Sequence, residues 1–221
     1  MKKYIKSLLE GERDEVSPWR IFRIMSEFVT GFEFLRNFKN TVSFFGSSRQ
    51  GFDSGVYKEA TRLAHRLSKS GFTIITGGGP GIMEAANKGA YEAGGPSVGI
   101  NIKVQHEQRA NKYVKESESF KYFFTRKVML SFSSQVYIFF PGGFGTLDEL
   151  FEMITLIQTK KIEPIPIILV NKEFWQPLLS WIDEYLYKRN HAIQKENIAL
   201  YHLVDTGDEA FRLITKLVKK K

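Results

Sequence analysis

Two stretches of this chain repeat one arrangement: a short apolar run, a glycine-rich loop and then the spacing of an amphipathic helix. In the first, the run 72–76 leads into GGGPG at 77–81, and helical spacing continues from Ile82. In the second, the run 136–140 leads into PGGFG at 141–145, and helical spacing of apolar residues continues from Leu150. Strands that alternate with helices are typical of a parallel sheet covered on both faces. We therefore predict an α/β fold with a Rossmann-like, doubly wound parallel sheet.

Further runs extend the same alternation along the chain. Strands are predicted over residues 41–46, 72–76, 97–102, 120–123, 136–140 and 165–170. Helices are predicted over residues 56–67, 82–90, 173–187 and 208–219, and Gly71 ends the first of them. The stretch 103–118 has no clear period, and irregular segments of that length inside a domain often carry function.

The first strand is preceded by a segment with a helical pattern of its own. Ser17 can cap a helix in which Pro18 takes the first position. Apolar residues then recur at helical spacing, so the segment should pack on the domain or on a partner; they are Phe22, Met25, Val29 and Phe32. A chain of 221 residues suits one α/β domain better than two. We predict a helical extension over residues 1–38 and a single nucleotide-binding domain over residues 39–221.

The composition excludes several kinds of site. The chain has no cysteine, so it has neither disulfides nor thiolate metal ligands. Its 4 histidines lie far apart in the sequence, and we predict no metal site and no other cofactor. The first residues, MKKYIK, lack the apolar segment of a signal peptide, and no apolar run approaches the length of a membrane span. We expect a cytoplasmic protein without membrane contact.

The net charge of +8 leaves two kinds of partner to compare, nucleic acid and small anions. The basic residues are scattered, and the only dense run is Lys219 to Lys221, which is better explained as a solvated tail. An anionic small-molecule substrate fits the charge equally well. We therefore predict no nucleic-acid partner.

The two glycine loops predict an anion site. At a junction between strand and helix, glycines let the backbone approach a ligand, and the unpaired N–H groups of the first helical turn favour negative charge. Both junctions should face the same rim of the sheet, where phosphate is the expected occupant. Neither loop is a dinucleotide fingerprint, because Ile82 and Asp148 stand where its third glycine belongs. No G-K-[ST] follows either loop, so neither NAD nor a Walker-type triphosphate site is predicted.

Two carboxylates, Asp148 and Glu149, follow the second glycine loop closely. Two interpretations stay open at this point. Thr146 and Glu149 satisfy the capping-box pattern, in which both side chains only close the start of the helix. Alternatively, a carboxylate beside an anion site takes part in chemistry.

Four motifs occur in order along the chain: FFGSSR at 44–49, TGGGPGIMEAANKGA at 76–90, TRKVML at 125–130 and PGGFGTLDE at 141–149. Together they resemble the LOG ("lonely guy") family of cytokinin riboside 5′-monophosphate phosphoribohydrolases, long labelled as lysine decarboxylases. The family pattern PGGxGTxxE is matched at every fixed position. The resemblance spans roughly residues 15–170, and the GGGPGIMEA loop is similar to a longer bacterial branch with an N-terminal helical extension.

The resemblance implies a reaction and a set of site residues. The reaction is cleavage of the N-glycosidic bond of a cytokinin riboside monophosphate or an AMP-like nucleotide, which gives free base and ribose 5-phosphate. Arg126 and Glu149 would be the catalytic residues. The phosphate would be bound by the second loop, through Gly142, Gly143, Gly145 and Thr146. Family members are usually dimers, so a homodimer or a larger even-numbered homo-oligomer is expected.

Further candidates for substrate binding lie in the other two loops. Ser47 and Ser48 follow the first strand and have hydroxyls that suit a phosphate or a base, although an ordinary turn is the alternative interpretation. Gly78 and Gly79 belong to the first glycine loop, whose backbone is predicted to approach the ligand.

Two charged candidates have plausible structural roles as well. Lys127 follows the arginine of the TRKVML motif, where an exposed helix cation is the ordinary interpretation. Glu84 lies just after the GGGPG loop, so it either contacts the ligand or complements the helix dipole. Both are retained as candidate binding residues.

Two other functions stay open from the sequence. A non-catalytic nucleotide sensor would use the same phosphate loops without turnover. A lysine decarboxylase would need a lysine that holds pyridoxal phosphate, and no lysine stands in such a setting.

Overall fold

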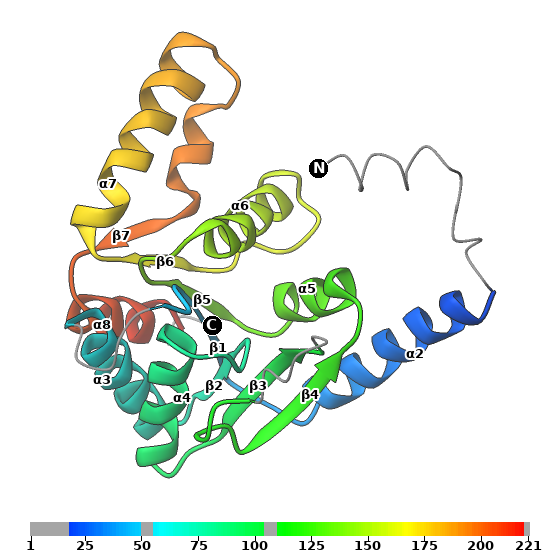
Figure 1. The fold of residues 1–221 in the computed structure, drawn as a ribbon. Helices are drawn as coiled ribbons and strands as arrows, with labels where there is room; N and C mark the ends of the chain where they lie inside the picture. Colours follow the sequence, from blue (N-terminus) through cyan, green and yellow to red (C-terminus); the bar gives the residue numbers. More distant parts are fainter. Residues whose placement is uncertain (1–17, 50–54, 104–109, 219–221) are drawn as a thin grey trace, which may run out of the picture.

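The fold is a single parallel sheet of seven strands in the order β4-β3-β2-β1-β5-β6-β7, which confirms the predicted α/β class. A computed structural model describes residues 18–49, 55–103 and 110–218 of the chain (Figure 1). The strands are β1 (Thr41–Phe45), β2 (Thr73–Thr76), β3 (Ser97–Ile102), β4 (Glu116–Phe120), β5 (Val136–Phe139), β6 (Ile167–Val170) and β7 (His202–Val204).

Helices cover both faces of this sheet (Figure 1). They are α2 (Pro18–Leu35), α3 (Gly55–Lys69), α4 (Ile82–Glu92), α5 (Phe123–Ser131), α6 (Phe144–Gln158), α7 (Lys172–Trp181) and α8 (Gly207–Val218). A π-helical segment (Ile182–Arg189) continues α7, and a 3₁₀ segment (Lys195–Leu200) precedes β7. None of the helices in the described ranges is both long and apolar enough to cross a membrane.

Successive strand residues point into two separate cores, as a doubly wound sheet requires. In β5, Val136 and Ile138 pack with α3, α4 and α8 on one face. Tyr137 and Phe139 pack with α5, α6 and α7 on the other. All four side chains are fully buried, which explains why this strand reads as an unbroken apolar run.

The strand predictions from sequence are wrong at the two edges of the sheet. A strand was predicted over residues 120–123, but β4 ends at Phe120 and α5 already begins at Phe123. β4 has the sequence ESESF and is largely exposed before its last residue, so it shows no apolar run. β7, at the opposite edge, is only three residues long and has no predicted counterpart.

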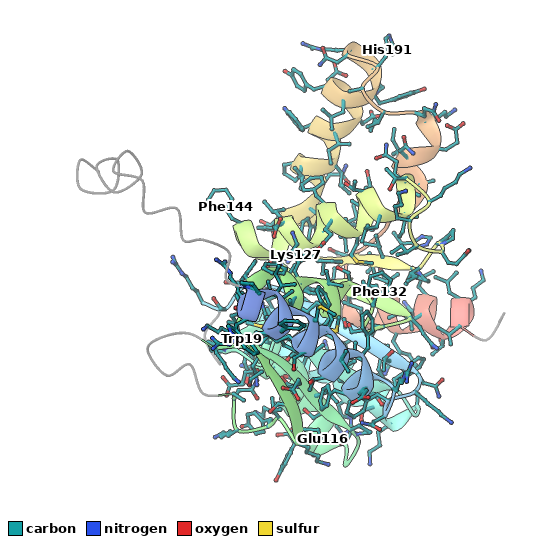
Figure 2. The ribbon with its side chains drawn as sticks, turned by 90° about the vertical axis from the view of Figure 1, so that its right-hand side faces the viewer. Trp19, Glu116, Lys127, Phe132, Phe144 and His191 are labelled. Atoms are coloured by element: carbon teal, nitrogen blue, oxygen red, sulfur yellow. The ribbon has the colours of Figure 1, made fainter. Side chains whose placement is uncertain are left out.

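Within the predicted N-terminal extension, Pro18–Leu35 form helix α2, and the residues that recur at helical spacing are not the ones that pack on the domain. Gly31 is the buried residue of α2, and a Cβ there would lie only 2.5 Å from Sδ of Met129 on α5. Phe22 and Val29, which were predicted to pack on the domain or on a partner, are 60% and 58% exposed and do not pack on the domain. Figure 2 shows α2 on the outside of the molecule, running from Trp19 towards the region of Phe132. Ser17, the predicted cap, lies outside the described residues.

A carboxylate of α2 also binds the start of α5. Glu27 accepts hydrogen bonds from the backbone N–H groups of Lys121 at 2.7 Å and Tyr122 at 3.3 Å. It accepts a third from the Thr125 hydroxyl at 2.5 Å. Because the N-terminal turn of a helix favours an anion, this contact stabilises α5 from outside the sheet.

The order of strands determines where a ligand can bind. β1 pairs with β2 on one side and with β5 on the other, and the chain leaves β1 and β5 towards opposite faces. Loops that diverge in this way open a crevice at the carboxyl ends of the strands. The loops after β1, β2 and β5 all reach this crevice.

Candidate active site

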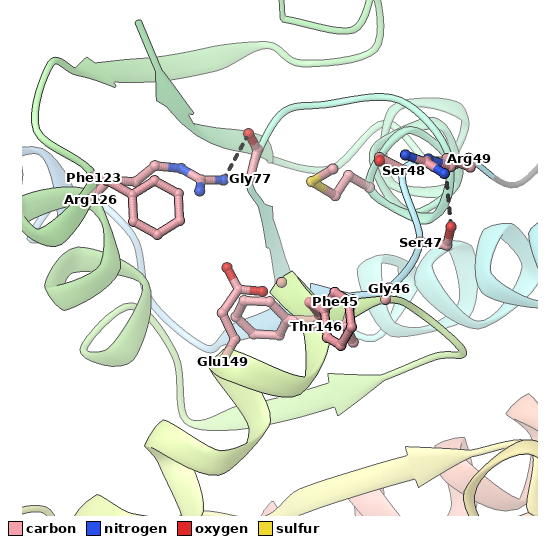
Figure 3. Close-up of a pocket in the computed structure, with 14 residues that line it drawn as sticks. Phe45, Gly46, Ser47, Ser48, Arg49, Gly77, Phe123, Arg126, Thr146 and Glu149 are labelled. Carbon is pink, nitrogen blue, oxygen red and sulfur yellow. Dashed lines mark hydrogen bonds between the residues drawn. The ribbon is translucent and has the colours of Figure 1, made fainter. Parts of the chain in front are cut away.

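A cavity of about 530 Å³ lies at the carboxyl ends of the central strands (Figure 3). Its size falls in the range of small-molecule sites, about 300–1,000 Å³. It is lined by the end of β1 and its loop, by residues that follow β2, by α5 and by the start of α6; these are Phe45, Gly46, Ser47, Ser48, Arg49, Gly77, Met83, Phe123, Arg126, Gly143, Phe144, Gly145, Thr146 and Glu149.

Backbone hydrogen bonds join the loops around the cavity. The N–H of Ser47 donates to the carbonyl of Pro141 at 2.9 Å, and the N–H of Ile82 donates to the carbonyl of Ser47 at 3.0 Å. Gly142 lies under the cavity, where a Cβ would meet the Thr146 hydroxyl oxygen at 2.2 Å. A side chain at this position would push the α6 loop out of place, so the contact requires glycine.

The start of α6 presents free N–H groups to the cavity. The helix begins at Phe144, and Gly143 is its N-cap residue without any side-chain hydrogen bond to the first turn. The N–H groups of that turn have no partner within a helix, and Gly143, Gly145 and Thr146 line the cavity. This arrangement suits a phosphate. It also shows that the capping-box interpretation is wrong, because Thr146 is inside the helix and Glu149 lies beyond its first turn.

Glu149 lines the cavity one helical turn further along α6. Figure 3 shows its carboxylate directed into the cavity, towards the side from which Arg126 approaches. Burial raises the pKa of Glu149 to about 7, while Arg126 opposes that shift and Asp148 adds to it. Near neutral pH the carboxyl group therefore exchanges readily between its two protonation states, which suits a general base.

Arg126 extends from α5 and is held by two backbone carbonyls. Its Nε donates to the carbonyl of Ile100 at 2.8 Å, and its Nη2 donates to that of Gly77 at 3.5 Å. Burial lowers the pKa of Arg126, and Glu149 opposes that shift. A Cβ on Gly77 would lie 2.2 Å from Nη2, so any other residue here would displace the guanidinium from this position. No ion pair joins Arg126 and Glu149 among the described residues, and a substrate can lie between them.

Most of the residues predicted for the site lie together. Ser47, Ser48, Gly143, Gly145 and Thr146 line the main cavity with the two predicted catalytic residues. Gly78 and Gly79 line an adjoining hollow of about 190 Å³. Gly142 supports the loop from below. The described residues contain no group of three or more histidine, aspartate or glutamate side chains that could hold a metal ion.

Besides Gly142, two predicted residues do not line either hollow. The Lys127 amine pairs with Asp148 at 2.7 Å and with Glu152 at 3.5 Å, so it joins α5 to α6. Glu84 is buried in the first turn of α4, where burial raises its pKa and Lys112 opposes that shift. Lys127 and Glu84 thus lie outside both hollows, and their role in binding stays a prediction.

Sequence reasoning missed the apolar wall of the site and one amide. Phe123 and Phe144 line the main cavity. Phe144 is part of the PGGFGTLDE motif, and Phe123 lies just before the TRKVML motif. Asn101 lines the smaller hollow. A polar residue near the end of the buried run 97–102 was a signal for it, because ligands bind at the carboxyl ends of parallel strands.

Comparison with known proteins shows which family the chain belongs to. The family model described as "Possible lysine decarboxylase" matches residues 83–214. The probable cytokinin riboside 5′-monophosphate phosphoribohydrolase LOGL3 of Oryza sativa subsp. japonica is 33% identical over 66% of this chain and 70% of its own. The cytokinin riboside 5′-monophosphate phosphoribohydrolase LOG1 of Arabidopsis thaliana is 30% identical over 81% of this chain and 83% of its own.

Solved structures agree with the fold. The molybdenum cofactor carrier protein of Chlamydomonas reinhardtii superposes with a TM-score of 0.63 at 19% identity, over 82% of this chain and 99% of that one. The molybdenum cofactor binding protein of Rippkaea orientalis superposes with a TM-score of 0.58 at 22% identity, over 80% and 95%. At such identities these two show the fold alone. Because the family model matches more than half of the chain, and a plant relative is 33% identical over a stretch that covers 70% of its own length, the chain belongs to the LOG family.

Proposed function

We propose that this protein is a phosphoribohydrolase that cleaves the N-glycosidic bond of a nucleoside 5′-monophosphate. One observation carries the proposal: a helix start with free N–H groups, a partly buried carboxyl group and a partly buried guanidinium line the same cavity. The first suits a phosphate, and the other two suit the reacting sugar. The names of the plant relatives support the same reaction, with cytokinin riboside 5′-monophosphate as their substrate.

In the proposed reaction, the phosphate binds the N–H groups at the start of α6 and the Thr146 hydroxyl. The bond between C1′ and the base nitrogen breaks, and positive charge builds on the ribose, as in glycosidases. Ionised Glu149 stabilises that charge and accepts a proton from the water that attacks C1′. Arg126 positions the ribose and phosphate. The base takes up a proton as it leaves, which balances the proton that Glu149 accepts from the water, and the other product is ribose 5-phosphate.

The pH dependence should report the ionisation of Glu149. We expect kcat/KM for AMP to rise as pH increases through about 7, since burial raises the pKa of Glu149 to about 7 and the ionised form is the active one. Rates of ribose 5-phosphate release between about pH 5 and pH 9 measure this profile. The phosphate of AMP itself titrates near pH 6. A profile that stays flat or falls across neutral pH would contradict the assigned role.

The reaction is tested by incubating the protein with a panel of nucleoside 5′-monophosphates, including a cytokinin riboside monophosphate, and assaying ribose 5-phosphate. Release of ribose 5-phosphate from at least one of them supports the proposal. Binding of the nucleotides without release identifies a sensor instead. The site disfavours decarboxylation of lysine, because no lysine is among the described residues that line the two hollows. Carbon dioxide release from lysine is the control.

The outer face of α2 also leads us to propose a homodimer or a larger even-numbered oligomer. Trp19 is 72% exposed and Phe22 is 60% exposed, and Met25 and Val29 lie exposed on the same helix. The face continues to the end of α5, where its C-cap residue Phe132 contacts Phe32 of α2 with ring centroids 6.1 Å apart. α5 also supplies Phe123 to the cavity, so a second copy seated here would lie close to the site. Apolar surfaces of this kind mark interfaces.

We expect light scattering at micromolar concentration to give the mass of a dimer or a larger even-numbered assembly. The double variant Phe22→Asp with Val29→Asp should dissociate it, because both side chains are exposed in one chain and would be buried in the assembly. Trp181→Asp is the matched control, since Trp181 is 48% exposed on α7, far from α2 in Figure 1. A monomeric unsubstituted protein would contradict the proposal.

A further inference from the structure

Two asparagines outside the hollows hold the first glycine loop, GGGPG at 77–81. Asn87 lies on α4 and is fully buried. Asn111 belongs to the stretch 103–118, which has no clear period in the sequence, and it is partly buried. Neither asparagine is among the residues that line the two hollows. Their effect on the site therefore passes through the residues that they contact.

Asn111 binds the loop with its backbone and with its side chain. Its N–H donates to the carbonyl of Gly78 at 2.9 Å. Its Nδ2 donates to the same carbonyl at 3.2 Å and to that of Gly79 at 3.0 Å. Its Oδ1 accepts from the N–H of Tyr113 at 3.2 Å, which orients the amide. One residue thus occupies two neighbouring carbonyls and joins the loop to the segment before β4.

Asn87 is the centre of a buried polar network behind the loop. Its Oδ1 accepts from the Asn111 Nδ2 at 3.0 Å and from the Thr76 hydroxyl at 2.6 Å. Its Nδ2 donates to the Ser97 hydroxyl on β3 at 2.9 Å. The Thr76 hydroxyl in turn accepts from the N–H of Gly78 at 2.9 Å. A buried network whose members are all paired fixes one geometry, because a shift would leave a buried group without its partner.

The loop held in this way lies directly against the guanidinium of Arg126. The Nη2 of Arg126 donates to the Gly77 carbonyl at 3.5 Å, and a Cβ on Gly77 would lie only 2.2 Å from that nitrogen. The Nε donates to the carbonyl of Ile100 on β3 at 2.8 Å. Asn87 binds the same strand, where its Nδ2 donates to the Val98 carbonyl at 3.3 Å. Both surfaces that hold the guanidinium are therefore tied to the network.

We propose that Asn87 and Asn111 are positioning residues, which act through the glycine loop to hold Arg126 in place across the cavity from Glu149. This inference rests on the proposed function, in which Arg126 positions the ribose and phosphate. A misplacement of about 1 Å at a catalytic group can lower a rate by about a hundredfold. The irregular stretch 103–118 thereby contributes to the geometry of the site through Asn111.

The test begins with Asn111→Leu, which removes both polar atoms of the amide at a similar size. We expect kcat/KM for AMP to fall at least about tenfold, because the guanidinium loses its fixed position. Hydrogen exchange of the peptide that spans residues 77–81 should become faster, since the loop opens more often. Asn111→Asp should act in the same way, because a carboxylate cannot donate to the two loop carbonyls. It also serves if leucine does not fit.

A double variant separates positioning from a general disturbance of the fold. In an Arg126→Lys background the guanidinium is absent, so Asn111→Leu should lower kcat/KM by less than about twofold further, since residues that act through one contact are not additive. Asn190→Leu is the matched control. It removes an amide that donates to the Tyr185 carbonyl at 2.7 Å outside both hollows, and it should change neither kcat/KM nor the exchange of 77–81.

The outcomes distinguish this inference from the proposed function. Unchanged exchange of 77–81, unchanged kcat/KM in both Asn111 variants, or a loss that is undiminished in the Arg126→Lys background overturns the inference and leaves the proposed function standing. If the unsubstituted protein cleaves no nucleoside monophosphate, the proposed function is overturned, and the inference with it.

Discussion

Replacing Glu149 by glutamine should lower kcat for AMP by about a hundredfold or more, as expected when electrostatic or base assistance is lost. Glutamine keeps the size of the side chain but cannot carry the charge that stabilises the ribosyl cation or accept the proton of the attacking water. Nucleotide affinity should stay the same or rise, because a negative charge near the phosphate is removed. Steady-state release of ribose 5-phosphate gives kcat, and calorimetry gives the affinity.

Thermal unfolding supplies the control for this variant. Burial raises the folded-state pKa of Glu149 to about 7, above an ordinary value of about 4.3. The stabilising contribution of the protonated group is complete below the lower pKa and is lost as pH rises through the higher one. Above pH 7 the glutamine variant should therefore be at least as stable as the parent. Asp148→Asn, a change at the exposed neighbour on α6, is the matched control and should keep kcat within a few-fold. Near-normal turnover in Glu149→Gln would contradict the catalytic role and leave Glu149 with a structural one.

AMP should be hydrolysed with a kcat/KM about a thousandfold above that of adenosine, since charge-assisted hydrogen bonds to a phosphate contribute several kcal/mol. Adenosine leaves the N–H groups at the start of α6 without their anion, so the ribose is no longer fixed between Glu149 and Arg126. Release of adenine from each compound measures the ratio. Equal turnover of the two would show that the helix start does not bind the phosphate.

The Thr146→Val variant tests whether the Thr146 hydroxyl binds the phosphate. Thr146 is buried at the cavity and sits in the first turn of α6. Valine keeps its shape and removes the hydroxyl, so kcat/KM for AMP should fall about tenfold. The slow turnover of adenosine should not change. A loss shared equally by both compounds would point to a disturbed loop rather than to a lost phosphate contact.

The sequence predicted the sheet and the glycine loops because their signals are local. Buried strands such as β5 are unbroken apolar runs, and the loops after β2 and β5 are marked by glycines that close contacts require. The start of α6 was misjudged for a related reason. The pattern from Thr146 to Glu149 is a valid local signal for a cap, but the backbone turns into the helix two residues before Thr146, at Phe144.

Contacts between distant segments are what the sequence could not reveal. The ion pairs that turn Lys127 away from the cavity come from Asp148 and Glu152, on a helix that follows β5. The environment of Asn101 depends on Gly78, more than twenty residues earlier in the chain. Such pairs arise only when the strands are ordered in space, and a single sequence carries no periodic signal for them.

The Glu27 carboxylate bears on where this protein can be divided. A cut at the start of β1 looks natural, because it keeps every strand of the sheet. It would also remove the acceptor for the N–H groups of Lys121 and Tyr122 at the start of α5, the helix that carries Arg126. Because Glu27 of α2 holds the start of the helix that carries Arg126, selection for turnover acts on α2 and Arg126 together, although α2 lies outside the sheet.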